Sequence, residues 1–253
     1  MDPDPIDMYP HLDKMHKNRS GLKGLLHKLN PLPLHVYLPL RFELYQAKVR
    51  FFAKGAHRKY RGKKGLLVNI GPGPNAKQGW VNLDIAKKGG VNCVYDCRKS
   101  LPFEDNSVKG IFMEHCLEHI DYTEEVPHFI SEVYRVLEPG GVIRIIVPDM
   151  EKYLRAYCEA DWEQLKDIRP LNDALEDHWF KCRYRTKMEL INMLFRQGFE
   201  HKYGYDFETL SFVLKKYGFD EVIHQTYGKS KMPELNLDQE QRASESLYIE
   251  AVK

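Results

Sequence analysis

Residues 66–74 read LLVNIGPGP, and this stretch decides the fold class. A short, mostly apolar run that stops at a glycine is typical of a buried strand followed by a tight turn. Gly71 and Gly73 carry no side chain, so a ligand can approach the backbone of that turn closely. The stretch therefore predicts a strand whose carboxyl end is open to a ligand.

Beyond this stretch, short apolar runs alternate with helical patterns. Apolar residues recur at helical spacing over residues 126–137, where Pro139-Gly140-Gly141 indicates the end of the helix, and a second helix is predicted over residues 207–217. The runs that predict strands are residues 66–70, 80–85, 91–95, 108–113, 142–147, 221–226 and 246–252. Such alternation is typical of an α/β fold with a parallel sheet, here of seven strands.

The residues that follow each strand are the candidates for ligand binding, because ligands of open α/β sheets bind beyond the carboxyl ends of the strands. An acidic residue at the end of the second strand can accept hydrogen bonds from both hydroxyls of a ribose. In chain order, these residues are Gly71-Pro72-Gly73-Pro74, Asp84, Asp96, Glu114-His115 and Pro148-Asp149.

At these positions the sequence resembles class I S-adenosylmethionine (SAM)-dependent methyltransferases of the methyltransferase type 11 group. The matching segments are NIGPG at 69–73, GWVNLD at 79–84, Asp96 with LPFEDNS at 101–107, EHCLEH at 114–119, EVYRVLEPGG at 132–141 and VPD at 147–149. Later segments resemble a bacterial subgroup that is often associated with surface-sugar pathways; they are His201, YDF at 205–207 and ESLYIEA at 245–251.

The resemblance implies a Rossmann-like sheet of seven strands, mostly parallel with an antiparallel last strand and helices on both faces. It also implies SAM as the cofactor and a set of cofactor-binding residues. These are Asn69, Gly71, Pro72, Gly73, Asp84, Ile85, Asp96, Cys97, Leu101, Glu114 and His115.

The link between the first two strands departs from the family pattern. Only residues 74–79 separate the glycine turn from Trp80, whereas a helical crossover takes a dozen or more residues. We therefore expect the usual first helix to be short or missing, which leaves open how the methionine carboxylate is held.

The same region weighs against two other interpretations of the glycines. The pattern Gly71-x-Gly73-x-x-Ala76 matches a dinucleotide fingerprint, but Pro72 and Pro74 lack the amides that a pyrophosphate needs, and Asp84 follows Gly71 too soon. NAD is thus disfavoured. A tight turn without any ligand is the other alternative.

Methyl transfer depends mainly on holding the nucleophile, the methyl carbon and the sulfur in line. A general base helps when the acceptor is a hydroxyl, and the candidate catalytic residues are His115, His201 and Asp149. The resemblance implies transfer to oxygen or nitrogen of a small-molecule or glycan acceptor, with a saccharide or glycan precursor as the first guess. The alternative is a SAM-binding protein without catalysis or a nucleic-acid-associated protein.

Residues 115–119, HCLEH, also match the HxxEH pattern of a group of zinc metallopeptidases. On a helix, His115 and His119 would share a face, Glu118 would act as a base, and Glu189 or Glu200 could supply a third ligand. The pattern lies within the methyltransferase series, so we expect no metal and keep a zinc hydrolase as a remote alternative.

Charge divides the chain into two predicted parts. Residues 1–64 carry 14 Lys/Arg against 5 Asp/Glu, a net +9, and residues 65–253 carry a net −7. We expect residues 1–64 to be a proline-broken basic arm, irregular to residue 40, with an amphipathic helix over 41–60. Residues 65–253 form the predicted methyltransferase domain, in which residues 150–205 are aromatic-rich and predicted to cover the substrate.

The basic arm suggests weak peripheral contact with anionic membranes. Nucleic acid is an unlikely partner, because no RNA-binding motif is present, and the oligomeric state is left open. Five cysteines without a Cys-x-x-Cys pair suggest neither disulfides nor a cysteine-rich zinc site. We expect a cytoplasmic protein, because no apolar run is long enough to span a membrane and the N-terminus does not resemble a signal peptide.

Overall fold

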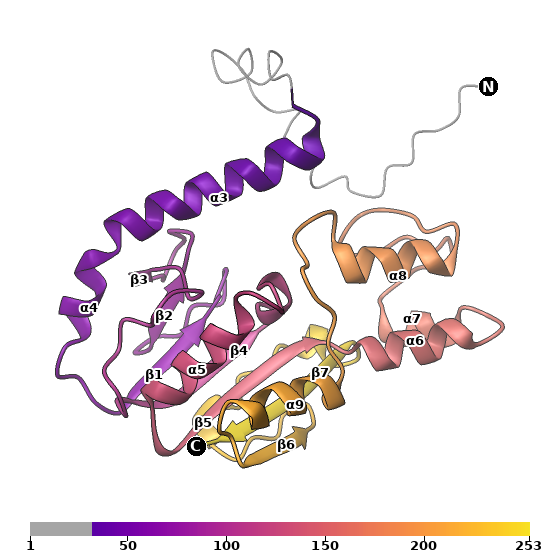
Figure 1. Cartoon of the computed structure of the whole chain (residues 1–253). Helices are drawn as coiled ribbons and strands as arrows, with labels where there is room; N and C mark the ends of the chain where they lie inside the picture. The colour runs from indigo at the N-terminus through magenta and orange to yellow at the C-terminus, as the bar shows by residue number, and fades with distance from the viewer. Residues whose placement is uncertain (1–31) are drawn as a thin grey trace.

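The computed structural model describes residues 32–253, which form an α/β sheet with flanking helices (Figure 1). The strands are β1 (Leu66–Ile70), β2 (Val81–Asp84), β3 (Cys93–Val94), β4 (Val108–Glu114), β5 (Leu137–Pro148), β6 (Glu221–Gln225) and β7 (Ser246–Val252). All seven predicted strands are present.

The strand order in the sheet is β3-β2-β1-β4-β5-β7-β6. The first five strands pair in parallel, whereas β7 runs antiparallel to both β5 and β6. The order of the strands reverses at β1, because β2 and β3 lie on one side of it and β4 and β5 on the other, and ligands of open α/β sheets bind beyond the strand ends at such a point. This confirms the predicted seven-stranded, mostly parallel methyltransferase sheet.

The register brings the carboxyl ends of the central strands level with one another. Ile70 at the end of β1 is paired with Leu83 on one side and with Met113 on the other, and Glu114 is paired with Ile146. Residues that follow these strands therefore meet along one edge of the sheet.

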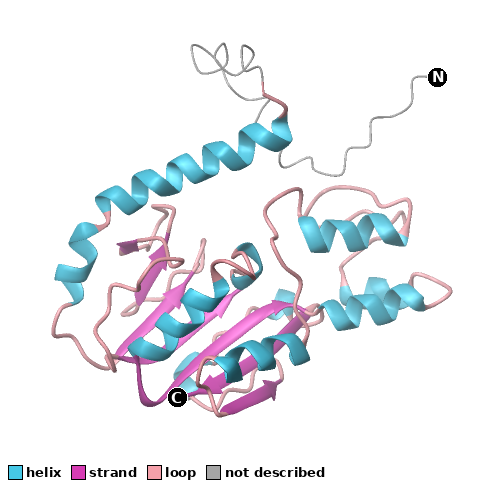
Figure 2. Cartoon of the chain, in the orientation of Figure 1, coloured by secondary structure: helices cyan, strands magenta, loops and turns pink. Residues whose placement is uncertain are grey.

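Helices cover the two faces unequally (Figure 2). One face packs against α5 (Val126–Val136) and α9 (Phe207–Lys216), whose apolar residues join the largest buried cluster. The opposite face packs against residues 226–242, where the helices are the single 3-10 turns η2 (Pro233–Leu235) and η3 (Glu240–Arg242). We predicted helices on both faces. The structure has α-helices on one face and short 3-10 turns on the other.

The segment between β1 and β2 contains no helix, as the short link predicts. Three asparagine side chains form hydrogen bonds with its backbone instead. Asn82 Oδ1 accepts from Lys77 N at 2.7 Å, Asn69 Nδ2 donates to the carbonyl of Asn75 at 3.2 Å, and Asn92 Nδ2 donates to the carbonyl of Trp80 at 2.7 Å. Hydrogen bonds that a crossover helix would make internally are made here by side chains of β1, β2 and the loop before β3.

The structure corrects the start of β5. We expected Pro139-Gly140-Gly141 to separate the helix from a strand at 142–147, but α5 ends at Val136 and β5 begins at Leu137. Leu137 pairs with Val108, and Gly140 N donates to the carbonyl of Lys253. The pairing between β4 and β5 therefore extends past the bend, where Gly140 has a φ of +79°.

The N-terminal helices also differ from expectation. Helix α3 (Leu34–Phe52) begins before residue 41 and contains Pro39, and α4 (Lys54–Tyr60) follows it. Val36 and Tyr37 already donate to the carbonyl of Pro33, so the helix is started before Pro39, and Pro39 removes only one donor. The prediction of an irregular arm to residue 40 is thus wrong for residues 34–40, and its remainder to residue 31 lies outside the described residues.

The predicted substrate cover contains α6 (Met150–Cys158), α7 (Glu163–Ile168) and α8 (Lys187–Arg196). These helices share a hydrophobic cluster separate from that of the sheet. The buried Tyr153 and Tyr184 and the partly buried Trp162 and Phe180 belong to it, so these aromatic residues of the segment are core residues. Among residues 32–253, no helix combines the length and apolar character that crossing a bilayer requires.

Candidate active site

The turn after β1 accepts only glycine at its first position. Gly71 has a φ of +67°, and a Cβ there would lie 2.5 Å from Cys116 Sγ, closer than real atoms approach. Gly73 has a φ of +52° but open space around it. The turn therefore brings the backbone of Gly71 against the segment after β4, where a ligand could contact both.

Asp84, at the end of β2, faces this turn. Its Oδ2 accepts from Gly73 N at 3.2 Å and its Oδ1 accepts from Ala86 N at 2.8 Å. A half-buried carboxylate held by two backbone donors keeps a fixed orientation and retains acceptor capacity for further hydrogen bonds.

Asp96 follows β3 and is already paired with two arginines. Its oxygens accept from Arg98 Nε at 2.9 Å and Nη2 at 3.0 Å, and from Arg50 Nε of α3 at 2.6 Å. Burial would raise the pKa of Asp96, but hydrogen bonds from Arg98 and Arg50 hold it below its ordinary value of 3.8. The predicted adenine-side residue thus also anchors α3 to the sheet.

A cavity of about 110 Å³ lies at this edge of the sheet, and we call it the first cavity. Five of the predicted cofactor-binding residues line it: Gly71, Asp84, Ile85, Asp96 and Cys97. Phe42 and Gln46 of α3 also line it, as do Cys116, His119 and Ile120 after β4. Sequence reasoning missed α3 here, because nothing local to residues 34–52 indicates which part of the sheet they cover.

The other predicted cofactor-binding residues lie around the first cavity without lining it. Asn69 and Pro72 are buried beneath the glycine turn, and Gly73 lies on it. Leu101 is buried, with its amide donating to Glu132, and Glu114 accepts from the backbone and side chain of Gln239. Their positions indicate support of the turn and the strand ends, and their contact with a cofactor stays a prediction.

A second cavity, of about 100 Å³, adjoins the first, because His119 lines both. His115, Glu118, His119 and His201 line it, together with Arg169, Arg242 and Glu245. These residues come from the segment after β4, from the substrate-cover segment and from the segment before β7. The structure thus brings together two of the three candidate bases, His115 and His201.

Asp149, the third candidate base, lines neither cavity. It is the N-cap residue of α6, where its side chain accepts from Lys152 N at 3.3 Å. Its carboxylate therefore serves the helix start in this structure.

His115 is held in an unusual backbone conformation. Its φ is +48°, which is uncommon for a residue with a side chain and concentrates at functional sites. Its Nε2 lies 3.0 Å from Ser246 Oγ and its Nδ1 lies 3.4 Å from Glu118 Oε1. Glu118 and Ser246 therefore fix the orientation of the ring in the second cavity.

The histidines and Glu118 influence one another's ionisation. Burial would raise the pKa of Glu118, but hydrogen bonding to His115 and the nearby histidines lower it to about 2, so the carboxylate is ionised near neutral pH. Burial lowers the pKa of His201, which keeps that ring neutral.

Glu245 forms hydrogen bonds with two other residues that line the second cavity, Arg169 and Arg242. Its Oε2 accepts from Arg169 Nη1 at 2.7 Å and from the Tyr153 hydroxyl at 2.9 Å, while its Oε1 accepts from Arg242 Nη1 at 2.5 Å. Arg242 and Glu245 thus form an ion pair, and both residues line the cavity. Both guanidinium groups contact the ring of Trp179. Its centroid lies 4.2 Å from Arg169 Cζ and 4.3 Å from Arg242 Cζ.

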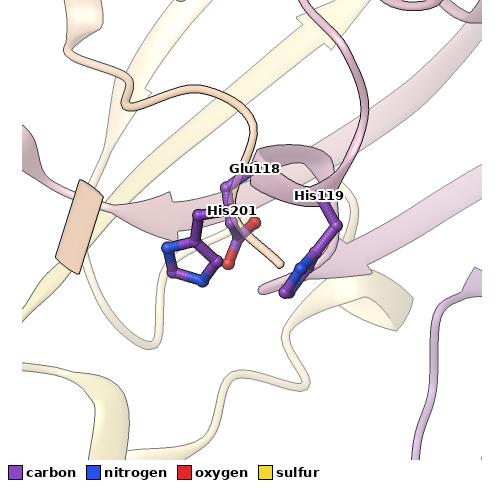
Figure 3. A group of neighbouring side chains, drawn as sticks. All are labelled: Glu118, His119 and His201. Carbon is purple, nitrogen blue, oxygen red and sulfur yellow. The ribbon is translucent and has the colours of Figure 1, made fainter. Parts of the chain in front are cut away.

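The arrangement that a zinc site at HxxEH requires is absent from residues 32–253. His115 precedes the 3-10 turn η1 (Leu117–His119) with a positive φ, so His115 and His119 do not share a helical face. The ligand types that do converge are Glu118, His119 and His201, and neither Glu189 nor the Glu200 side chain joins them (Figure 3).

The seven-stranded α/β sheet, with its cavity beyond the central strand ends, has the architecture that the resemblance to class I methyltransferases implies. A family model described as "Methyltransferase domain" matches residues 76–145, from the loop before β2 into β5. Residues 76–145 are therefore similar to a methyltransferase domain, which supports the resemblance drawn from the sequence over that range. The matched range begins after the glycine turn.

No curated protein sequence matches the chain. Among solved structures, it is similar to a SAM-dependent methyltransferase from Archaeoglobus fulgidus, with a TM-score of 0.43 and 19% identity over 83% of this chain and 94% of that one. A SAM-dependent methyltransferase from Thermotoga maritima, titled a possible histamine N-methyltransferase, has a TM-score of 0.44 and 18% identity over 87% and 97% of the two chains. Likenesses at this level identify no methyl acceptor.

Proposed function

We propose that the chain binds SAM in the first cavity and transfers its methyl group to an oxygen or nitrogen atom of an acceptor in the second cavity. The observation that supports this most directly is that His119 lines both cavities. A donor and an acceptor in adjoining cavities are already close, and holding them in line can lower the barrier by roughly 7–11 kcal/mol.

The residues of the first cavity fit the cofactor's chemistry. Gly71, which lines the cavity, has no side chain and presents its backbone there, and the Asp84 carboxylate can accept from ribose hydroxyls. Bound SAM would supply a methyl group already activated by the sulfonium. The cavity of about 110 Å³ is smaller than the roughly 300–1,000 Å³ of typical ligand pockets, so binding requires α3 to move outward.

The second cavity suits a polar acceptor. Ionisable residues provide most of its lining, with Phe180 and Leu194 among the few apolar groups. Hydroxyls of a saccharide or glycan precursor, our first guess for the acceptor, would find both donors and acceptors there. Of the candidate bases, His115 is the best placed to take a hydroxyl proton, because it lines this cavity and its ring is fixed by Ser246 and Glu118.

Cofactor binding is tested by calorimetric titration with SAM and with its demethylated product, S-adenosylhomocysteine. Asp84→Ala should weaken binding more than tenfold, or about 1.4 kcal/mol, because two charge-assisted hydrogen bonds are lost. Asp220→Ala is the matched control, since Asp220 is exposed and lies before β6. Equal affinities of the two variants would remove Asp84 from the site.

Methyl transfer is tested with radiolabelled SAM against saccharides, nucleotide sugars and amines. His115→Asn should lower kcat by about 10²- to 10⁴-fold for a hydroxyl acceptor. It should reduce S-adenosylhomocysteine affinity much less, because His115 lines the second cavity and not the first. Cofactor binding without transfer to any acceptor would favour the alternative of a SAM-binding protein without catalysis.

A further inference from the structure

Glu118, His119 and His201 form a cluster that methyl transfer does not require. Each offers one potential metal-ligating atom, and these atoms lie within 4.8 Å of one another. Figure 3 shows the Glu118 carboxylate between the two rings, with His119 beside it on the same turn and His201 on a separate segment. The cluster combines two imidazoles and one carboxylate, the set found in many catalytic metal sites.

Backbone hydrogen bonds determine which nitrogen of each ring carries the proton. His119 Nδ1 lies 3.1 Å from the carbonyl oxygen of Glu200, and His201 Nδ1 lies 2.5 Å from that of Leu194. A carbonyl oxygen only accepts, so both Nδ1 atoms must be donors. In the neutral rings, each Nε2 then presents a lone pair. Histidine ligands of metals are oriented in this way, with the other ring nitrogen donating to a carbonyl or carboxylate.

Glu118 adds a negative charge, and one of its two carboxylate oxygens lacks a hydrogen-bond partner. Its side chain is 1% exposed, and its Oε2 has no hydrogen-bond partner. His115 Nδ1, 3.4 Å from Oε1, is its nearest cationic or donor partner, and none of the ion pairs formed by Arg or Lys within residues 32–253 includes Glu118. An unpaired acceptor in a buried carboxylate is costly unless a cation or a proton donor lies beside it.

The chain also holds the two halves of the cluster together independently of any ligand. Lys202 N and Tyr203 N both donate to the backbone carbonyl of Glu118, at 2.7 and 3.3 Å. The segment that carries His201 is thereby fixed to the turn that carries Glu118 and His119, so the ligand atoms are brought together before an ion binds.

We propose that Glu118, His119 and His201 bind one divalent transition-metal ion, of the class that includes zinc and iron(II). Imidazole nitrogens favour these ions over magnesium and calcium, which prefer all-oxygen sites. All three residues line the second cavity, so the coordination positions that the protein leaves free face that cavity. The site goes beyond the proposed function, because methyl transfer from a sulfonium needs no metal.

Cobalt(II) is the probe, because its visible absorption reports coordination directly. The full chain is dialysed against a chelator and titrated with Co²⁺, and Zn²⁺ is then added. We expect one equivalent of Co²⁺ to produce visible bands that Zn²⁺ abolishes and that Mg²⁺ at the same concentration leaves intact. Glu118→Gln and His201→Gln should each weaken Co²⁺ binding by at least about 100-fold, since loss of outer-shell partners alone costs about 10- to 100-fold.

The matched control is His224→Gln, which removes an exposed histidine of β6 and should bind Co²⁺ like the wild type. Absence of visible bands, or equal binding by Glu118→Gln and His224→Gln, would overturn the site. It would leave a protonated histidine as the partner of Glu118.

A measurement on the unmodified chain covers the case in which the variants do not fold. Anomalous diffraction from a crystal soaked in Zn²⁺ should place a peak about 2.0–2.2 Å from a ligand atom of each of the three residues. A peak elsewhere, or none, rejects the proposal. Calorimetry with S-adenosylhomocysteine on metal-free protein tests the proposed function separately, so failure of one proposal is distinguishable from failure of the other.

Discussion

The edge of the sheet and helix α3 face each other across the first cavity, but they are held in different ways. At the sheet edge, backbone groups and carboxylates are fixed by partly buried hydrogen bonds, as at Asp84 and Asn82. Helix α3 exposes Phe51 and Phe52, at 69% and 71%, and is attached through ion pairs of Arg50 with Asp96 and of Glu43 with Arg98, and through a hydrogen bond from the Tyr45 hydroxyl to the carbonyl of Ile85. The difference supports our proposal that α3, and not the sheet edge, moves when a ligand binds.

The largest expected effect concerns the sheet. Arg144 of β5 is fully buried and pairs with Asp238 at 2.6 Å and with Glu250 at 3.0 Å. Arg144→Met should lower the free energy of unfolding by about 3–5 kcal/mol, because two buried carboxylates lose their partner. Chemical denaturation measures this. Arg155→Met, which breaks an exposed pair with Glu151, is the control and should cost at most about 1 kcal/mol.

A second test compares the two glycines of the turn. Gly71→Ala should weaken S-adenosylhomocysteine binding more than tenfold, or about 1.4 kcal/mol, because the added Cβ collides with Cys116. Gly73→Ala carries a similar backbone strain without a collision, so its affinity should be reduced much less. If calorimetry finds the same loss for both variants, the close approach to Cys116 is not what matters.

The pairing of Asp96 predicts a pH dependence of stability. Because its arginine partners hold the pKa of Asp96 below the ordinary 3.8, the ionised form stabilises the folded state. This stabilisation is fully present above pH 3.8 and is lost as the pH falls through the lower folded pKa. The free energies of unfolding of the wild type and of Asp96→Asn, measured between pH 7 and pH 2.5, should therefore converge only at the acid end of this range. A constant difference would contradict this.

Loosening α3 should have a smaller effect on stability. Arg50→Gln leaves Asp96 paired with Arg98 and removes the ion pair of Arg50 with Asp96, while Glu43 of α3 still pairs with Arg98. We expect the free energy of unfolding to fall by at most about 1 kcal/mol, while amide exchange in α3 accelerates. Exchange that stays unchanged would show that other contacts hold the helix.

The smallest stability change is expected at the exposed end of α3. Phe51 and Phe52 lie close to basic residues of α4, and we propose that this end docks weakly on anionic membranes. The double change to serine should alter stability by less than about 0.5 kcal/mol and reduce sedimentation with phosphatidylserine vesicles. Unchanged sedimentation would exclude this surface as the contact.

Much of the sheet could be predicted because its signals are local. The bounds of β1 and β7 are those that the apolar runs indicate, and the missing helix after β1 follows from the length of the link. The start of β5 was misplaced because a proline and two glycines normally end regular structure, whereas pairing with β4 and the contact with Lys253 continue the strand here. The start of α3 was misplaced for a similar reason at Pro39.

The candidate site was only partly predictable. Residues that follow strands were found, because parallel strands deliver their carboxyl ends to one edge, and Gly71, Asp84 and Asp96 do line one cavity. The pairing of Glu118 with His201 was missed, because the two residues are remote in sequence and no spacing rule relates them.

The sequence alone determined the alternation of strands and helices and the residues at the strand ends, since periodicity and turn residues act over a few neighbouring positions. Only the tertiary structure decided that α3 lies over the first cavity, that Asp149 caps a helix and that two histidines meet Glu118. Those contacts join segments through long loops, and their geometry depends on packing of the whole chain.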